Sequence, residues 1–243
     1  MTARQYRAVV RVATFMALLS GGTVSAQSLT VLPVTIQMAP GRMATALTVI
    51  NQGDSETGVQ VRAFAWNQPD GNDWLTSSEE VLASPPLATI APRATQIVRL
   101  VLRRPPQEHE ATYRVLLDQI PPPAAPGTVR IALRLSIPVF AEPATRVAPH
   151  VKFHIERDAG HAWLVAVNDG GRHETIRDIT LTTSEGSGLR TEANVSPYVL
   201  AGATRRWRIV EQARLPVPGG MVRLTARAET GVVDQPVSVV AAP

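Results

Sequence analysis

The sequence contains side chains that could do chemistry, but their spacing matches no catalytic or metal-binding motif. His150 and His154 are four residues apart, so on a strand they would share one face. A zinc site needs three or four ligands, and no cysteine or carboxylate stands at a companion spacing. We therefore interpret both histidines as solvated strand residues, and we predict no metal site and no cofactor.

The candidates for nucleophile and for acid or base are equally weak. The serine in "SEGSG" (184–188) lacks the Gly-x-Ser-x-Gly order of a nucleophile elbow, and we interpret the stretch as a hairpin tip. The acidic residues Glu79, Glu80, Glu108 and Glu110 lie in polar loops beside prolines, where carboxylates are normally solvated. A secreted hydrolase on a β-sandwich would need a cluster of perturbed carboxylates or histidines, and no such pattern is present. We predict that the protein is not an enzyme.

The elements that would position these side chains are strands. Short runs rich in valine, threonine, isoleucine and leucine alternate with turn residues, and no segment has a sustained helical period, which is typical of an all-β fold. The first seven expected strands are 29–38, 43–51, 58–67, 87–90, 94–102, 111–120 and 128–140. The second seven are 151–155, 162–168, 175–183, 189–193, 203–210, 221–229 and 232–240. Seven strands in about 100 residues suit one immunoglobulin-like sandwich, so we predict two in tandem.

The start of the chain is typical of a signal peptide. Three arginines precede a short apolar run that ends in small residues, so we predict a signal peptide over 1–26 and export of the rest. Its removal takes three arginines and no acid from a formal charge of +4, which leaves about +1 and gives no reason to predict nucleic-acid binding. We place a first immunoglobulin-like domain at 27–143 and a second β-sandwich at 144–243, joined through the proline-containing stretch "AEPATRVAP" (141–149). Cysteine is absent, so both domains must be stabilised by their cores.

One stretch, "TVRIALRLSIPVF" (128–140), alternates for longer than a single domain needs. Six aliphatic side chains share one face of this strand, whereas strands in globular proteins are usually about 5 or 6 residues long. Either the strand bends so that all six residues serve their own core, or part of the apolar face lies beyond that core. In the second case the strand can complete the sheet of another protein, with main-chain hydrogen bonds for pairing and alternate side chains for pockets.

Several phrases, in order along the chain, carry a family likeness: "LASPPLATIAP" (82–92), "TYRVLLDQIP" (112–121), "IALRLSIPVFAEP" (131–143), "VNDGGRH" (167–173) and "YVLAGATRRW" (198–207). With them the mature chain resembles a periplasmic pilus (fimbria) assembly chaperone of the chaperone–usher pathway. The resemblance implies two immunoglobulin-like domains set at an angle like a boomerang. It also implies that the last strand of the first domain is donated to a pilus subunit, which the outer-membrane usher then receives.

Carried onto this sequence, the resemblance implies that Val129, Ile131, Leu133 and Leu135 enter pockets of the subunit, whereas Ile137 and Val139 lie nearer the domain's own core. Better-known members anchor the subunit's C-terminal carboxylate with an arginine on the first strand and a lysine on the last strand. Residues 28–41 contain no basic group, and the lysine position falls on Pro138, which resembles the archaic, Csu-like branch with its spore-coat-U-like subunits. Arg114 is our first candidate for the anchor and Arg134 our second.

Two functions remain open at this point. The leading hypothesis is a non-enzymatic periplasmic chaperone in pilus assembly, and hence in cell wall organisation, that could cover its own edge as a homo-oligomer when free. The alternative is a structural or adhesive two-domain component of a surface fibre. A chaperone would bind one subunit and release it, whereas a fibre component would polymerise.

Overall fold

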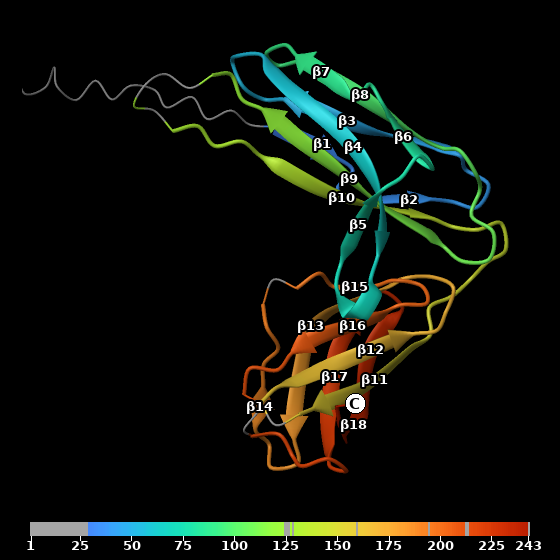
Figure 1. Cartoon of the computed structure of the whole chain (residues 1–243), viewed down its shortest axis with the longest axis vertical. Helices are drawn as coiled ribbons and strands as arrows, with labels where there is room; N and C mark the ends of the chain where they lie inside the picture. Colours follow the sequence, from blue (N-terminus) through green and yellow to red (C-terminus); the bar gives the residue numbers. More distant parts are fainter. Residues whose placement is uncertain are drawn as a thin grey trace, which may run out of the picture.

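The computed structural model describes residues 29–123, 127, 129–158, 160–193, 195–211 and 214–242. The expected signal peptide lies outside these residues. Figure 1 shows two β-sheet domains set at an angle, with the first domain above the second and an open side between them. The short 3-10 turn η1 (Pro69–Gly71) lies between β4 and β5, and none of the described residues forms a helix able to cross a membrane.

The first domain consists of two sheets that enclose one core. One sheet runs in the order β1 (Leu29–Leu32), β3 (Ala44–Asn51), β8 (Thr95–Leu102) and β6 (Val81–Ser84). The other runs in the order β2 (Ile36–Met38), β10 (Arg134–Ala141), β9 (Ala111–Ile120), β4 (Thr57–Asn67) and β5 (Trp74–Ser77), and β7 (Leu87–Ile90) also pairs with β4. Neighbouring strands are antiparallel except β2 and β10, which are parallel.

Alternation explains how these strands bury their cores. Along β9 the side chains of Tyr113, Val115 and Leu117 are buried, and the residues between them lie on the outer face of the sheet. Leu47 and Val98 face them from the other sheet with no exposed surface. The outer face of the β9 sheet is therefore free to carry the polar and aromatic side chains that meet the second domain.

The second domain is a continuous ladder of strands around a second core. The order is β14 (Gly188–Leu189), β13 (Glu174–Thr183), β17 (Met221–Ala228), β18 (Gly231–Ala241), β11 (Val151–Arg157), β12 (Ala162–Asn168) and β16 (Thr204–Arg208), and β15 (Tyr198–Val199) also pairs with β13. The strand β18 pairs antiparallel with β17 over 231–238 and parallel with β11 over 239–241. It therefore joins the two halves of the ladder, which cross at a steep angle in Figure 1.

The structure confirms the predicted all-β fold and differs from the expected strands at several places. The stretch 29–38 forms two strands, β1 and β2, instead of one. The strands β5, β6 and β15 were not predicted, and the expected strand 189–193 is replaced by the two-residue β14. The expected strand 128–140 was wrong at its start, because β10 begins only at Arg134. Of residues 129–133, Leu133 still bonds to Gln119 of β9, and residues 129–132 have no partner strand there.

Candidate functional site

The apolar residues that precede β10 lose their exposure gradually along the chain. Val129 is 93 % exposed, Ile131 85 % and Leu133 40 %. Leu135 is partly buried against the first core, and Ile137 is 3 % exposed within it. The long apolar face therefore has two parts, of which the second belongs to the domain's own core. We call residues 129–133 the apolar segment; in Figure 1 it continues β10 away from the second domain.

The apolar segment is exposed because its neighbour in the sheet ends too early. The strand β9 stops at Ile120, and prolines follow at 121–123, which cannot donate ladder hydrogen bonds. The last contacts are those of Gln119, whose backbone N–H donates to the Leu133 carbonyl at 2.9 Å, while the Leu133 N–H reaches the Gln119 side-chain oxygen at 3.4 Å. Before Leu133 the chain keeps an extended apolar pattern without a neighbouring strand on this side.

Arg134, at the start of β10, has a partner on the neighbouring strand. Its Nε donates to Asp118 Oδ1, and Arg62 Nη2 donates to the other oxygen of Asp118 at 2.6 Å. The hydrogen bond from Arg134 lowers the pKa of Asp118, burial opposes this, and Arg62 adds to the lowering. Arg134 is therefore engaged in an ion pair on the outer face of the sheet.

Arg114 lies on the same outer face, next to the junction of the domains. It stands opposite Pro138 of β10 in the ladder, so it occupies the position beside the one where the resemblance expects a lysine. Its guanidinium carbon is 3.7 Å from the centre of the Trp66 ring and 5.5 Å from that of Tyr198. Both distances are typical of cation–π contacts. Burial lowers the pKa of Arg114, while the charge of Asp73 acts in the opposite direction.

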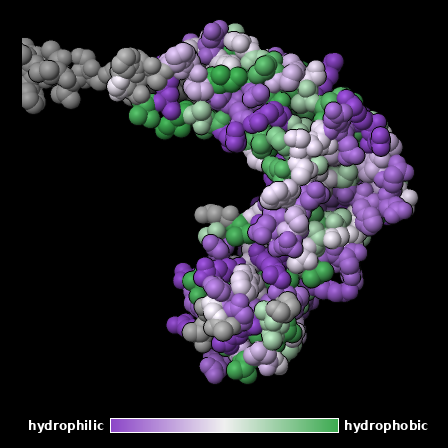
Figure 2. Space-filling view, in the orientation of Figure 1, coloured by the Kyte–Doolittle hydropathy of each residue, from purple (hydrophilic) through white to green (hydrophobic). Residues whose placement is uncertain are grey.

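Arg114 lines a cleft between the two domains with a volume of about 830 Å³. The first domain contributes Asp70 and Asp73 from the β4–β5 hairpin, and the second contributes Arg205 and Arg206 from β16. The space-filling view in Figure 2 shows the molecule hollowed on the side between its domains, with mostly hydrophilic residues around the hollow. The cleft thus combines aromatic surface with charges of both signs.

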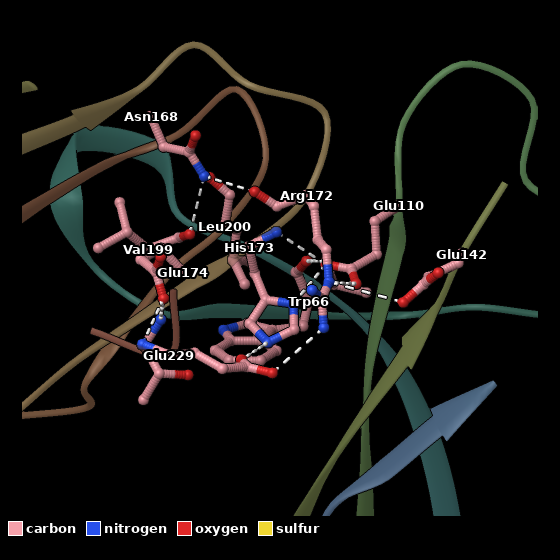
Figure 3. A network of polar contacts seen from close by, with 12 residues as sticks. Trp66, Glu110, Glu142, Asn168, Arg172, His173, Glu174, Val199, Leu200 and Glu229 are labelled. Carbon is pink, nitrogen blue, oxygen red and sulfur yellow. Dashed lines mark hydrogen bonds and ion pairs between the residues drawn. The ribbon is translucent and has the colours of Figure 1, made fainter. Parts of the chain in front are cut away.

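A buried polar network fixes the two domains at this junction (Figure 3). His173 donates its backbone N–H to Glu110 Oε2 at 3.0 Å, and its Nδ1 lies 2.6 Å from the same oxygen. Both side chains are 1 % exposed. The His173 ring stacks on Phe140 with centroids 3.6 Å apart, and Arg172 lies 3.6 Å from a carboxylate oxygen of Glu142. Charges from β9, from the end of β10 and from the second domain therefore meet in a water-poor site.

A second set of contacts comes from the β4–β5 hairpin. The side chain of Gln68 donates to the Tyr198 carbonyl at 2.8 Å and accepts from the Leu200 N–H at 3.0 Å, across the domain boundary. Trp66, Phe140 and Leu200 form a small buried apolar cluster between the domains. The interface therefore has both an apolar centre and polar contacts that determine its register.

Two of these residues were misjudged from the sequence. Glu110 was expected to be a solvated loop carboxylate, but it is buried because its partner comes from a turn 63 residues away. For His173 no contact with the first domain was predicted, but its ring contacts Glu110 and Phe140 there. Asn168 does hold that turn, because its amide donates to the carbonyls of Arg172, Val199 and Leu200.

The histidines considered for a metal site are each near a separate carboxylate. His150 Nδ1 contacts Asp169, and His154 Nε2 is 3.2 Å from Glu156. Lys152 donates to the same Asp169 and lowers the pKa of that exposed carboxyl. Among the described residues, no group of three or more potential metal ligands is formed.

Comparison with known proteins agrees with this geometry. Residues 28–146 match the family model for pili and flagellar-assembly chaperones, PapD N-terminal domain. No curated protein matches the chain. A chain from the CsuC–CsuE chaperone–tip adhesion subunit pre-assembly complex, from archaic chaperone–usher Csu pili of Acinetobacter baumannii, is 20 % identical with a TM-score of 0.64. The match covers 89 % of this chain and 100 % of that one.

Two further solved structures share the fold. One is the Escherichia coli chaperone DraB, 19 % identical with a TM-score of 0.53 over 89 % of this chain and 97 % of that one. The other is from the complex of the Salmonella enterica SafA pilin with the SafB chaperone, 16 % identical with a TM-score of 0.59 over 90 % of this chain and 98 % of that one. The two-domain fold of the chain is thus the one seen in these chaperone structures. The first domain, residues 28–146, therefore belongs to the family of pili and flagellar-assembly chaperones, PapD N-terminal domain.

Proposed function

We propose that this chaperone acts in the periplasm, where it binds pilus subunits by donating the apolar segment and the start of β10 to an incomplete subunit sheet. The observation that carries the proposal is the exposure of Val129 and Ile131, which are among the most exposed large apolar side chains of the described residues. A strand that is extended, apolar on one face and unpaired at its edge has the properties required for adding a strand to another sheet.

The exposures of the four proposed donor residues support unequal contributions to binding. Val129, Ile131 and Leu133 together expose the equivalent of about two complete aliphatic side chains. Their burial in a subunit would supply roughly 3–6 kcal/mol before the costs of association. Leu135 already packs against the first core, so its additional gain on binding a subunit is smaller.

Between the two candidate anchors for the subunit's C-terminal carboxylate, the contacts favour Arg114. Arg134 already contacts Asp118, which would have to be displaced. Arg114 makes no hydrogen bond or ion pair with any residue that the structure describes, and it lines the cleft beside Pro138. A partly desolvated guanidinium without an acid partner is a strong site for an incoming carboxylate.

The proposed partners are pilus subunits and an outer-membrane usher. The likeness in fold to the Csu complex and the proline at position 138 support the archaic branch, and with it subunits that resemble spore-coat-U domains. No step of this function requires covalent chemistry, because binding energy alone would stabilise the subunit.

The test is co-purification from periplasmic extracts with pilus subunit candidates encoded in the same operon. The Ile131→Arg variant should abolish recovery of the subunit and leave the free chaperone folded, because Ile131 is 85 % exposed. Arg130→Ala is the matched control, since residue 130 points to the opposite face of an extended chain and should leave recovery unchanged. Full recovery of the subunit with Ile131→Arg would refute donation by this segment.

A further inference from the structure

Arg114 has an acidic neighbour with which it does not pair. Arg114 and Asp73 both line the interdomain cleft and both contact the Trp66 indole, Arg114 over the ring and Asp73 at Nε1. No hydrogen bond or ion pair joins them in the described part of the chain. If Asp73 were free to turn to Arg114, it would act as an internal counter-ion and compete with any carboxylate that enters the cleft.

The carboxylate of Asp73 is held in place by three donors. Its Oδ1 accepts hydrogen bonds from Trp66 Nε1 at 3.1 Å, from Gln68 Nε2 at 2.9 Å and from Arg205 Nη1 at 3.1 Å. The indole of Trp66 separates the two charges, because Arg114 lies over its ring and Asp73 lies at its N–H edge. Of the three donors, Arg205 is the one that carries a charge.

Arg205 belongs to the second domain and is built firmly into the junction. Its side chain is 7 % exposed, and its Nη1 also donates to the Gly71 carbonyl at 3.2 Å. Burial lowers the pKa of Arg205, and Asp73 opposes that shift. The next cation on β16, Arg206, is occupied by Glu156, with Nη2 2.7 Å from Oε2. Arg205 is therefore the cation that balances Asp73.

We propose that Arg205 is a positioning residue for the carboxylate anchor: by binding Asp73 from the second domain, it leaves Arg114 without an internal counter-ion. This inference rests on the proposed role of Arg114 in binding the subunit's C-terminal carboxylate. It makes the anchor a joint product of both domains, although Arg114 itself belongs to the first. When the second domain is correctly docked, Asp73 is neutralised and Arg114 is available.

The loss of Arg205 should therefore weaken carboxylate binding without any change to Arg114. A carboxylate without a cation partner, when it lies within about 4–6 Å of an opposite charge, typically shifts the pKa of that group by about one unit or more, which is a tenfold change in its equilibrium constant. We expect Arg205→Gln to lower the affinity of Arg114 for a carboxylate by about tenfold. Removal of the competing charge as well, in Arg205→Gln with Asp73→Asn, should restore the affinity to within about twofold of the native value.

The experiment uses chain 27–243 labelled with ¹⁵N-arginine, with acetate as the probe and acetamide as the uncharged control. The guanidinium resonance of Arg114, assigned with Arg114→Gln, should shift saturably with acetate and not with acetamide. No shift in the native protein would refute the anchor, and the inference with it. A native shift together with an equal acetate response in Arg205→Gln would refute the inference alone. If Arg205→Gln does not fold, Asp73→Asn still decides, because Arg205 already neutralises this acid and its loss should change the acetate affinity by less than about twofold. A gain of about tenfold would show that Asp73 still competes for Arg114 in the native protein, and it would contradict the proposal.

Discussion

The buried pair of Glu110 and His173 allows a quantitative prediction for the junction of the domains. The substitution Glu110→Ala removes the carboxylate that accepts two hydrogen bonds from His173, and it leaves the imidazole buried against Phe140. It also takes one negative charge from the neighbourhood of Arg172. Removing one member of a buried, hydrogen-bonded pair typically costs about 3–5 kcal/mol.

We therefore expect Glu110→Ala to lower the free energy of unfolding by about 3–5 kcal/mol, measured by urea denaturation. The control is Glu108→Ala, because Glu108 is exposed two residues away and its loss should change stability by less than about 0.5 kcal/mol. Glu110→Gln keeps hydrogen-bonding capacity without the charge and should fall between the two.

The assay can also separate the domains. Each domain has two tryptophans, Trp66 and Trp74 in the first and Trp163 and Trp207 in the second, so fluorescence of single-domain tryptophan variants reports each unfolding transition. In the Glu110→Ala protein the two transitions should move apart, since the interface no longer couples them. A loss of stability below about 1 kcal/mol, equal to that of the exposed control, would refute the view that this pair holds the domains together.

Three further predictions follow from individual environments. Burial, aided by Glu80, raises the pKa of Tyr113 to about 12 from an ordinary 10. About 1–3 kcal/mol of stability is therefore present below pH 10 and is lost as the pH rises through 12. The Tyr113→Phe variant should lose less stability between about pH 9 and 11.5 than the native chain, and equal losses would contradict this. Arg134→Gln should raise the lowered pKa of Asp118, and with it the pH at which that group's stabilisation is lost on acidification, as followed by NMR of the carboxyl carbon; an unmoved titration would refute the pairing. Gly170→Ala would place a Cβ 2.4 Å from the backbone nitrogen of His150 and should lower the free energy of unfolding in urea by about 2–3 kcal/mol. Gly188 has open space around it, so Gly188→Ala should lower that free energy far less. Equal effects of the two substitutions would contradict the close packing at Gly170.

The alternation of apolar residues was sufficient to predict most strands, because each buries one face in a core. It failed for β5, where Trp74–Ser77 is exposed throughout and has no apolar face to detect. It also overextended β10, because alternation reports which side chains could be buried and not where the neighbouring strand ends. The proline cluster at 121–123 after β9 was the signal that could have placed that limit.

The site was predictable only in part, for a different reason. The proposed donor residues lie in one continuous stretch, so their pattern is readable. The ring partners of Arg114, in contrast, come from two separate strands, β4 and β15, and Arg205 stands 91 positions later in the chain than Arg114. The pairing of Glu110 with His173 likewise depends on how two domains dock, which no local pattern records.

The position of β18 between β17 and β11 determines when each domain can form. A chain emerges from synthesis or export with its N-terminus first, and the first domain has all its strands once residue 141 is free. The second domain cannot close its ladder until residues 231–241 arrive, because β17 pairs only with β13 and β11 only with β12 until then. The second domain, which supplies Arg205 to Asp73, therefore closes after the first, and the proposed anchor cleft is complete only once β18 has joined the ladder.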